Sequence, residues 1–532
     1  MALPVVRAVP LLLCLLTSCS RAQEAGDEVE PMKATVVVID QVLNTVSPLL
    51  FGDNIEWTNN GMGLWRPEEG RLDAALVAEL REVGITHLRY PGGTLSDYFD
   101  WRKSVGTERS PIPNPFARPK GKPEYPAFGV DEFLALCREL SVPATITLNA
   151  GTGSVEEAVA WVRYLTDRKA EVLDYTVGNE IYLAGDNGGD VPELPINKTP
   201  DEYADFYLAC REGVRSVDPN ARVGAIAVRV VGNETPSQPG SWMETVLRRC
   251  GASADFIDIH HGYAPLLRRS PAPGVPELTD DEFAEAFMGA PRYVDETIDA
   301  VERDIAAYVP GDGANLRVHI TEYGPLVYPF GSGDPISDLR WNRSITGAVY
   351  LAGLYHVMAS HPRIESANHL PLVQDIFGAL VGIRSPGPRT WRNAVFYVFR
   401  TYSRLAGTTM VATNVTSPAY STRIAGFVPA MNDVPFVEAG AFRAADGRRL
   451  TVCLIHRSAV RPAEATLDPG RSATLERATV LAGDSCLAEN TPERPDAVVP
   501  AAIAATQAED RTVTLELPPH SLTVLEFELE GA

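Results

Sequence analysis

Residues Asp174–Tyr182 read DYTVGNEIY, and this stretch indicates the fold of the whole chain. Its apolar, β-branched first half is typical of a buried strand, which delivers Asn179 and Glu180 at its carboxyl end. A second stretch of the same design, Val318–Gly324 (VHITEYG), delivers Glu322. Carboxylates at the ends of buried parallel strands are typical of a (β/α)8 TIM barrel, whose active sites lie at the carboxyl ends of the strands.

Apolar segments of this kind alternate with helix signals between residues 41 and 405. After the first segment, apolar residues recur at helical spacing from Leu72 to Val83, and Gly84 ends the helix. This alternation predicts a (β/α)8 catalytic barrel over residues 41–405. The predicted barrel strands are Leu50–Trp57, His87–Gly93, Ala144–Gly151, Asp174–Glu180, Arg222–Val228, Phe256–Tyr263, Arg317–Gly324 and Ser366–Leu372.

The last part of the chain has a different pattern. Residues 406–532 contain short strands with alternating apolar and polar residues, such as Arg449–His456 and Thr512–Leu517. A lone strand, Ala34–Asp40 (ATVVVID), precedes the barrel. We expect residues 34–40 and 406–532 to form one antiparallel β-sandwich domain.

The first residues resemble a targeting signal. Arg7 and the apolar run Val9–Leu16 are typical of a signal peptide over residues 1–22, and the run is too short to span a membrane. The sequence around Cys19 resembles a lipobox, in which that cysteine is lipidated, while cleavage after Ala22 is the alternative. Residues up to about 33 would then form a tether. We expect an exported protein, either a membrane-anchored lipoprotein or a secreted one.

The composition restricts the partners and cofactors. The 532 residues carry a net charge of −22, which disfavours nucleic acid and polyanionic polysaccharides and is compatible with neutral sugars. No cysteine or histidine spacing is typical of a metal site, so we expect neither a metal nor an organic cofactor. Cys453 and Cys486 could pair if they are oxidised.

The two strand-end carboxylates are of the type that glycosidic bond cleavage requires. A retaining glycoside hydrolase uses one carboxylic acid to protonate the leaving oxygen and a second carboxylate, roughly 5 Å away, as nucleophile. Glu180 is the better acid, because the amide of Asn179 beside it suits a sugar 2-hydroxyl, and Glu322 is the better nucleophile. We expect mutual repulsion to raise the pKa of Glu180 while Arg89, at another strand end, keeps Glu322 ionised.

Several motifs follow one another in the order seen in clan A glycoside hydrolases, and the chain most closely resembles the family 51 α-L-arabinofuranosidases. The motifs are NIE at Asn54–Glu56, LRYPGG at Leu88–Gly93, GNE at Gly178–Glu180, HHGY at 260–263 and SANHLPLVQDIFGAL at 366–380.

This resemblance implies roles for single residues. Glu180 would be the acid/base and Glu322 the nucleophile. The substrate-binding residues would be Glu56 for the terminal sugar, Arg89 for orienting the nucleophile, Asn179 for the 2-hydroxyl, His260 or His261 facing the site, and Tyr263 as partner of the nucleophile.

The chain departs from the family pattern near the sugar. Thr94 follows YPGG where the family usually has Asn, Trp57 follows NIE in place of His, and Pro371 stands where Gln is frequent. VHITEYG also differs from the usual sequence around the nucleophile. The resemblance therefore supports the bond-cleaving residues better than the sugar specificity.

Together these observations predict a retaining glycoside hydrolase that acts on α-L-arabinofuranosyl groups of polysaccharides or oligosaccharides. One alternative is another clan A activity, an endo-β-glycanase or a β-xylosidase, with the same two carboxylates. A second alternative is a glycan-binding surface protein on an inactive barrel. The distance between Glu180 and Glu322 separates the enzyme from the binding protein: about 5 Å favours the retaining enzyme, and more than about 10 Å favours binding only. The resemblance also allows an oligomer.

Overall fold

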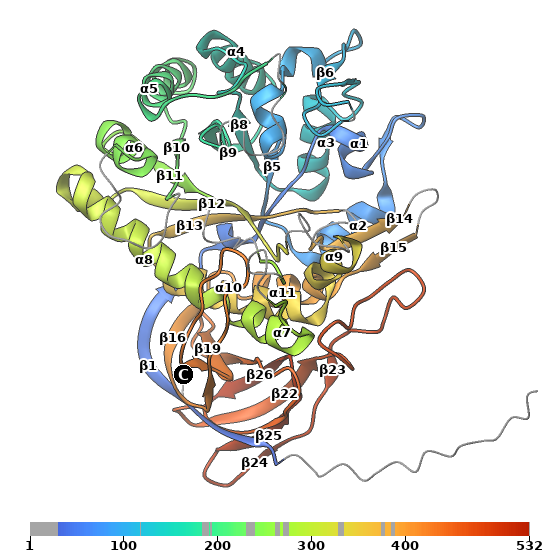
Figure 1. Ribbon diagram of the computed structural model, residues 1–532, viewed down its shortest axis with the longest axis vertical. Helices are drawn as coiled ribbons and strands as arrows, with labels where there is room; N and C mark the ends of the chain where they lie inside the picture. Colours follow the sequence, from blue (N-terminus) through green and yellow to red (C-terminus); the bar gives the residue numbers. More distant parts are fainter. Residues whose placement is uncertain are drawn as a thin grey trace, which may run out of the picture.

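The computed structural model describes residues 30–117, 119–183, 191, 194–229, 240–260, 267–269, 276–327, 335–373, 378–384 and 389–530. Two bodies make up the fold, a barrel surrounded by helices in the upper part of Figure 1 and a β-sheet domain below it.

The barrel is closed by eight parallel strands, as the sequence predicted. Each strand lies within a predicted segment or overlaps one, and most are buried along their whole length because helices cover the outside. In chain order they are β2 (Gly52–Asn54), β5 (His87–Tyr90), β8 (Ala144–Leu148), β9 (Val172–Val177), β10 (Val223–Ala227), β11 (Phe256–Ile259), β12 (Arg317–Tyr323) and β13 (Ile364–His369).

The helices begin and end at the signals that their sequences carry. Gly84 ends α2 with a left-handed φ of 84°, a conformation that favours glycine. Thr199 and Glu202 form a reciprocal capping box at the start of α5. The main helices are α2 (Ala74–Val83), α3 (Val130–Leu140), α4 (Val155–Asp167), α5 (Pro200–Val217), α6 (Trp242–Cys250), α7 (Asp280–Gly289), α8 (Pro291–Tyr308), α9 (Pro335–Arg343), α10 (Ile345–Ser360) and α11 (Ala394–Ser403).

The second body is built on a ten-stranded sheet in the order β23-β22-β26-β20-β19-β16-β1-β21-β25-β24. Apolar side chains from both halves of the sheet, such as Val36, Val452, Leu467 and Phe527, meet in one core. The strands are β1 (Met32–Thr45), β16 (Thr409–Thr416), β19 (Val437–Arg443), β20 (Arg449–His456), β21 (Ala463–Asp468), β22 (Ala473–Leu481), β23 (Ala501–Ala502), β24 (Ala505–Gln507), β25 (Val513–Leu517) and β26 (Ser521–Leu529).

The sheet differs in one respect from the purely antiparallel domain that we expected. β1 pairs antiparallel with β16 on one side but parallel with β21 on the other. Parallel neighbours cannot be joined by a hairpin, and here the whole barrel separates the two strands in the chain. The lone N-terminal strand therefore sits in the middle of the sheet order and joins its two halves.

A polar network, buried except for part of Glu438, joins the two bodies. His356 of α10 contacts Glu438 of β19, Nδ1 to Oε1, at 2.7 Å, and Tyr402 of α11 lies 2.8 Å from the other ring nitrogen. Arg457 forms an ion pair with the same carboxylate. Burial alone would raise the pKa of Glu438, but Arg457 and His356 outweigh burial and lower it to about 2.

The five cysteines within the described ranges are all buried and free. Cys453 and Cys486 therefore do not form the disulfide that we considered. Within those ranges, no helix combines the length and the apolar character needed to cross a membrane.

Candidate active site

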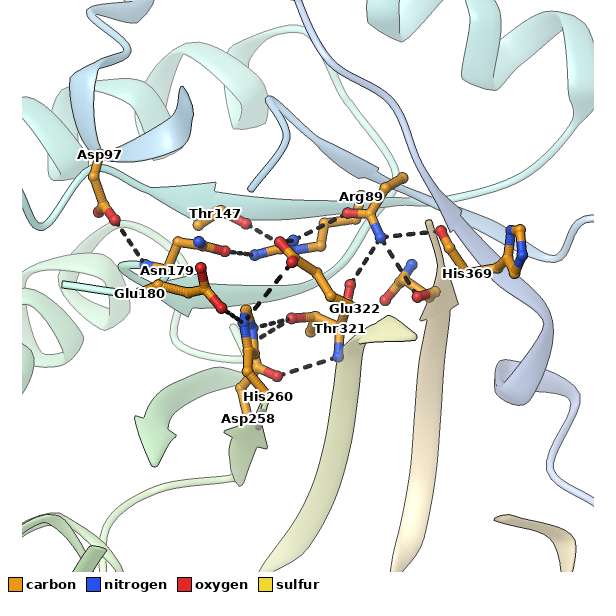
Figure 2. A network of polar contacts seen from close by, with 12 residues as sticks. Arg89, Asp97, Thr147, Asn179, Glu180, Asp258, His260, Thr321, Glu322 and His369 are labelled. Carbon is orange, nitrogen blue, oxygen red and sulfur yellow. Dashed lines mark hydrogen bonds and ion pairs between the residues drawn. The ribbon is translucent and has the colours of Figure 1, made fainter. Parts of the chain in front are cut away.

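Polar side chains converge at the carboxyl ends of the barrel strands (Figure 2). They come from strands or strand ends far apart in the chain and form one hydrogen-bonded network. The residues of this network are Asn54, Arg89, Thr147, Asn179, Glu180, Asp258, His260, Thr321 and Glu322. Among them are five of the eight predicted catalytic and substrate-binding residues.

Arg89 of β5 is the centre of the network, and its side chain is fully buried. Its Nη1 donates to Oε1 of Glu322 at 2.9 Å and to Oδ1 of Asn54 at 3.0 Å. Its Nη2 donates to Oδ1 of Asn179 at 2.6 Å, and its Nε to the hydroxyl of Thr147 at 3.0 Å. One guanidinium thus orients side chains from four other strands or strand ends.

Glu180 and Glu322 face each other across His260. A carboxylate oxygen of each glutamate and a ring nitrogen of His260 all lie within 4.8 Å of one another. His260 Nδ1 is 3.1 Å from Oε1 of Glu180 and 4.0 Å from Oε2 of Glu322. Both carboxylates keep some exposure, 19% for Glu180 and 15% for Glu322, while His260 beneath them is buried. The two carboxylates therefore lie close together and are both partly accessible to solvent.

Two carboxylates and a hydroxyl surround His260. Its Nε2 lies 3.0 Å from the hydroxyl of Thr321 and 3.6 Å from Oδ2 of Asp258. Burial alone would lower the pKa of His260, but Asp258, Glu322 and Glu180 outweigh burial and raise it to about 10. His260 is therefore an imidazolium at neutral pH, with a positive charge between Glu180 and Glu322.

The ionisation of Glu322 reflects opposing effects. Burial raises its pKa above the ordinary value, and the charge of Glu180 adds to this effect. The positive charges of His260 and Arg89 act in the opposite direction and favour the carboxylate.

Glu56 lies half-buried just after β2 and accepts a hydrogen bond from the hydroxyl of Thr58 at 3.2 Å. Burial raises its pKa to about 7. The two glycines of LRYPGG bring their backbone against the carboxylates: a Cβ on Gly92 would lie 2.9 Å from Cγ of Glu56, and one on Gly93 would lie 2.5 Å from Oε1 of Glu322. A larger residue at either position would occupy the space beside these groups.

Asn179 offers a hydrogen-bond donor that no described residue accepts. Its Oδ1 accepts from Arg89, which fixes the orientation of the amide, and its residue is fully buried. Within the described part of the chain, Nδ2 has no hydrogen-bond partner. A buried donor without a partner is costly, so the position suits a ligand oxygen.

The remaining predicted positions are placed as follows. His261, Tyr263 and Cys19 lie outside the described residues. Trp57 is buried and packs on Phe99 with a ring-centroid distance of 6.0 Å. Thr94 is buried at the start of the 3-10 helix η2 (Thr94–Tyr98).

Sequence reasoning missed Asp97, Asp258, Thr321 and Thr147. Asp258 stands two positions before His260, and alternation along a strand would have placed both on one face. Thr321 directly precedes Glu322, but its backbone N–H and hydroxyl bond Asp258 of the neighbouring strand, which no local pattern indicates.

Glu180, His260 and Glu322 are also the one group in the described ranges whose ligand-type atoms are close enough to hold a metal ion. The hydrogen bond between His260 and Glu180 accounts for part of this approach without a metal.

Two family models match the chain. The α-L-arabinofuranosidase 1 domain matches residues 79–185, and the α-L-arabinofuranosidase C-terminal domain matches residues 335–521. An exo-α-(1→6)-L-arabinofuranosidase of Bifidobacterium longum is 26% identical over 92% of this chain and 96% of its own length. An intracellular exo-α-(1→5)-L-arabinofuranosidase of Streptomyces lividans is 25% identical over 90% of this chain and 73% of its own length.

The second of these relatives, and three further ones, are named intracellular enzymes. These names contradict the prediction of an exported lipoprotein or secreted protein, which was wrong and is not retained. That prediction depended on a short apolar run and on Cys19, which is a local sequence pattern.

The fold agrees with the sequence relatives. The crystal structure of the family 51 arabinofuranosidase of Xanthomonas axonopodis pv. citri superimposes with a TM-score of 0.78, over 93% of this chain and all of that one, at 22% identity. Together with the two domain models and the barrel-plus-sheet architecture, these matches show that the chain resembles the family 51 α-L-arabinofuranosidases of clan A in sequence and in fold over almost its whole length.

Proposed function

We propose that this chain is a retaining α-L-arabinofuranosidase that removes terminal arabinofuranosyl groups from polysaccharides or oligosaccharides. The observation that carries the proposal is the approach of Glu180 and Glu322, whose nearest ligand-type oxygens lie within 4.8 Å of each other. Retaining enzymes hold their two carboxyl groups about 5 Å apart, whereas inverting enzymes leave room for a water molecule between them. The exo-acting relatives supply the sugar and the mode of attack.

In the first step, Glu322 is the nucleophile and Glu180 the acid. A carboxylate oxygen of Glu322 forms a bond to the anomeric carbon while the bond from this carbon to the leaving oxygen breaks. The carboxyl proton of Glu180 moves to that oxygen. Arg89 and His260 stabilise the attacking carboxylate before it reacts, because both place positive charge beside it.

In the second step, Glu180 acts as base. It takes a proton from a water molecule whose oxygen attacks the anomeric carbon, and Glu322 leaves as a carboxylate. Two inversions give net retention, and Glu180 is protonated again for the next cycle.

The surrounding groups hold the sugar. The unused Nδ2 of Asn179 donates to the 2-hydroxyl next to the anomeric carbon, and Glu56 binds another hydroxyl of the terminal sugar. We extend the proposed sugar contacts to His261 and Tyr263, which follow His260 in the chain. The barrel of the predicted division, residues 41–405, contains all these residues. β1 continues to Thr45 within the sheet, however, so we propose that residues 32–45, and not 34–40 alone, form the sheet domain with residues 406–532.

The test is hydrolysis of a panel of 4-nitrophenyl glycosides by the wild type and by Glu322→Ala. The panel contains the α-L-arabinofuranoside, the β-D-xyloside, the β-D-glucoside and the β-D-galactofuranoside. We expect release from the arabinofuranoside, lost in the variant. Release from the β-D-xyloside alone would keep the mechanism and refute the sugar. Proton NMR of the first product formed by transfer to methanol reports the anomeric configuration, and inversion would refute the double displacement.

A further inference from the structure

Asp97 is a buried carboxylate beside the site that the mechanism above does not use. It lies in η2, the 3-10 helix that follows β5, and its side chain is fully buried. Figure 2 shows this side chain directed at the backbone of the segment that carries Asn179 and Glu180. A buried carboxylate needs compensating hydrogen bonds, so its partners indicate what it holds in place.

The partners of Asp97 belong to two other strand ends. Its Oδ2 accepts the backbone N–H of Asn179 at 3.2 Å, just after β9. Its main-chain carbonyl accepts both the N–H of Thr152, at 3.0 Å, and the hydroxyl of Thr152, at 3.1 Å, in the loop after β8. Asp97 thus connects the loops that follow β5, β8 and β9.

The backbones around Asp97 approach one another closely. A Cβ on Gly151 would lie 2.5 Å from the carbonyl oxygen of Asp97, and one on Gly178 would lie 2.9 Å from Cβ of Ala150. Gly178 has a φ of +81° and immediately precedes Asn179. Glycine is the most mobile backbone link, so the chain that carries Asn179 and Glu180 needs an external restraint to keep one direction.

We infer that Asp97 is a positioning residue, which accepts the N–H of Asn179 and thereby fixes the backbone from which the side chains of Asn179 and Glu180 reach the sugar. The inference rests on the proposed function, in which Glu180 protonates the leaving oxygen. Without this hydrogen bond, rotation about Gly178 displaces the acid while the nucleophile, on β12, keeps its place. Proton donation to the leaving oxygen is then impaired, while the attack by Glu322 is not.

This selectivity separates positioning from a merely structural role. A variant that only folds less well loses the same fraction of activity on every substrate. A displaced acid slows the first step strongly on substrates with a poor leaving group, because they need the proton. It slows this step much less on nitrophenyl glycosides, which do not need the proton. The ratio of the two activities is therefore independent of how much enzyme is folded.

Three variants give the comparison. Asp97→Ala removes the acceptor, and Asp97→Asn keeps an amide oxygen in its place. Asp174→Asn is the matched control, because Asp174 is an equally buried carboxylate in the first half of β9, away from Asn179, and its Oδ2 lies 3.5 Å from Nδ1 of His319. For Asp97→Ala we expect kcat/KM, which reports the first step alone, to fall about 100-fold on an arabino-oligosaccharide, since small misplacements have effects of this size. On the nitrophenyl arabinofuranoside we expect a fall of less than about tenfold.

The ratio of activity on the oligosaccharide to activity on the nitrophenyl glycoside should be close to the wild-type value in Asp97→Asn. In Asp174→Asn this ratio should equal that of the wild type. Equal losses of Asp97→Ala on both substrates would overturn the inference while leaving the proposed function intact. A wild type inactive on both substrates would instead refute the proposed function.

A second measurement needs no substrate. Hydrogen–deuterium exchange of a peptide that covers residues 176–183 reports the protection of the amides around and including that of Asn179. We expect faster exchange in Asp97→Ala and near wild-type exchange in Asp97→Asn. Unchanged exchange in Asp97→Ala would overturn the inference whatever the wild type hydrolyses.

Discussion

Nη1 of Arg89 lies 2.9 Å from Oε1 of Glu322, and no part of the arginine side chain reaches solvent. The same guanidinium also holds the amide oxygen of Asn179, so nucleophile and sugar-binding amide share one rigid donor. A planar fork can satisfy both directions at once, whereas an ammonium cannot.

We therefore expect Arg89→Lys to lower kcat on the nitrophenyl arabinofuranoside about 100-fold, because one oriented donor to the reacting carboxylate is lost. Arg457→Lys is the control, since Arg457 is also a buried arginine in an ion pair but lies between the barrel and the sheet domain. The control should lower the melting temperature and leave kcat unchanged. Equal kcat for both variants would contradict the role of Arg89.

The roles of the two carboxylates predict opposite responses to mutation. Glu180→Ala should retain the first step on 2,4-dinitrophenyl glycosides, which need no proton, and azide should accelerate the second step by replacing water. Glu322→Ala should be inactive on the same substrate. The rate of dinitrophenol release, with and without azide, checks both statements. Azide acceleration in Glu322→Ala instead would exchange the two assignments.

The barrel could be predicted from the sequence because each of its strands is a local signal. A buried parallel strand is an apolar run, and its functional residue stands at the carboxyl end, as in DYTVGNE and VHITEYG. Arg89, Glu180 and Glu322 were found for this reason.

The groups that connect the strands could not be predicted, because their partners are distant in the chain. Asp97 bonds a backbone N–H that lies 82 positions away, and nothing near Asp97 distinguishes it from other polar loop residues. The parallel pairing of β1 with β21 likewise depends on where the barrel brings the chain, and not on either strand. The protonation of His260 required knowing that Asp258 and Glu322 both surround it.

Asp258 should control the alkaline limit of activity. The pKa of His260 is raised to about 10, so the folded state binds its proton more tightly than the unfolded chain. This contribution to stability is complete below about pH 6.5 and is lost as pH rises towards 10. In Asp258→Asn the pKa of His260 falls, so the alkaline limb of kcat/KM should move to lower pH. If the alkaline limb of the kcat/KM profile lies at the same pH in Asp258→Asn and in the wild type, the charge of His260 does not contribute to the reaction.

Buried carboxyl groups in the barrel should weaken the fold as the pH rises through the acid range. Burial raises the pKa of Asp53 to about 6 and that of Glu56 and of Asp97 to about 7. The folded state therefore holds protons that the unfolded chain releases near pH 4, and the stability that they provide is lost as pH rises from about 4 to about 7.

Glu56→Gln removes one of these protons. Urea unfolding at pH 4.5 and at pH 7.5 should show a smaller loss of stability between the two values in this variant than in the wild type. Glu365 and Glu438 do not interfere, because their pKa values are lowered to about 2 and both stay ionised across this range. An equal difference in variant and wild type would refute the raised pKa of Glu56.

The network between the barrel and the sheet domain should matter to stability and not to catalysis. In Glu438→Gln, Arg457 stays buried without its counter-charge, and His356 loses its carboxylate partner. Breaking one side of a buried ion pair costs about 3–5 kcal/mol, because the remaining charge is left without compensation. Urea unfolding measures this loss, and kcat at a temperature well below the transition should equal that of the wild type. A fall in kcat at full folding would mean that the contact between the two bodies also sets the geometry of the site, since α10 lies against strands of the sheet on one side and against the barrel on the other.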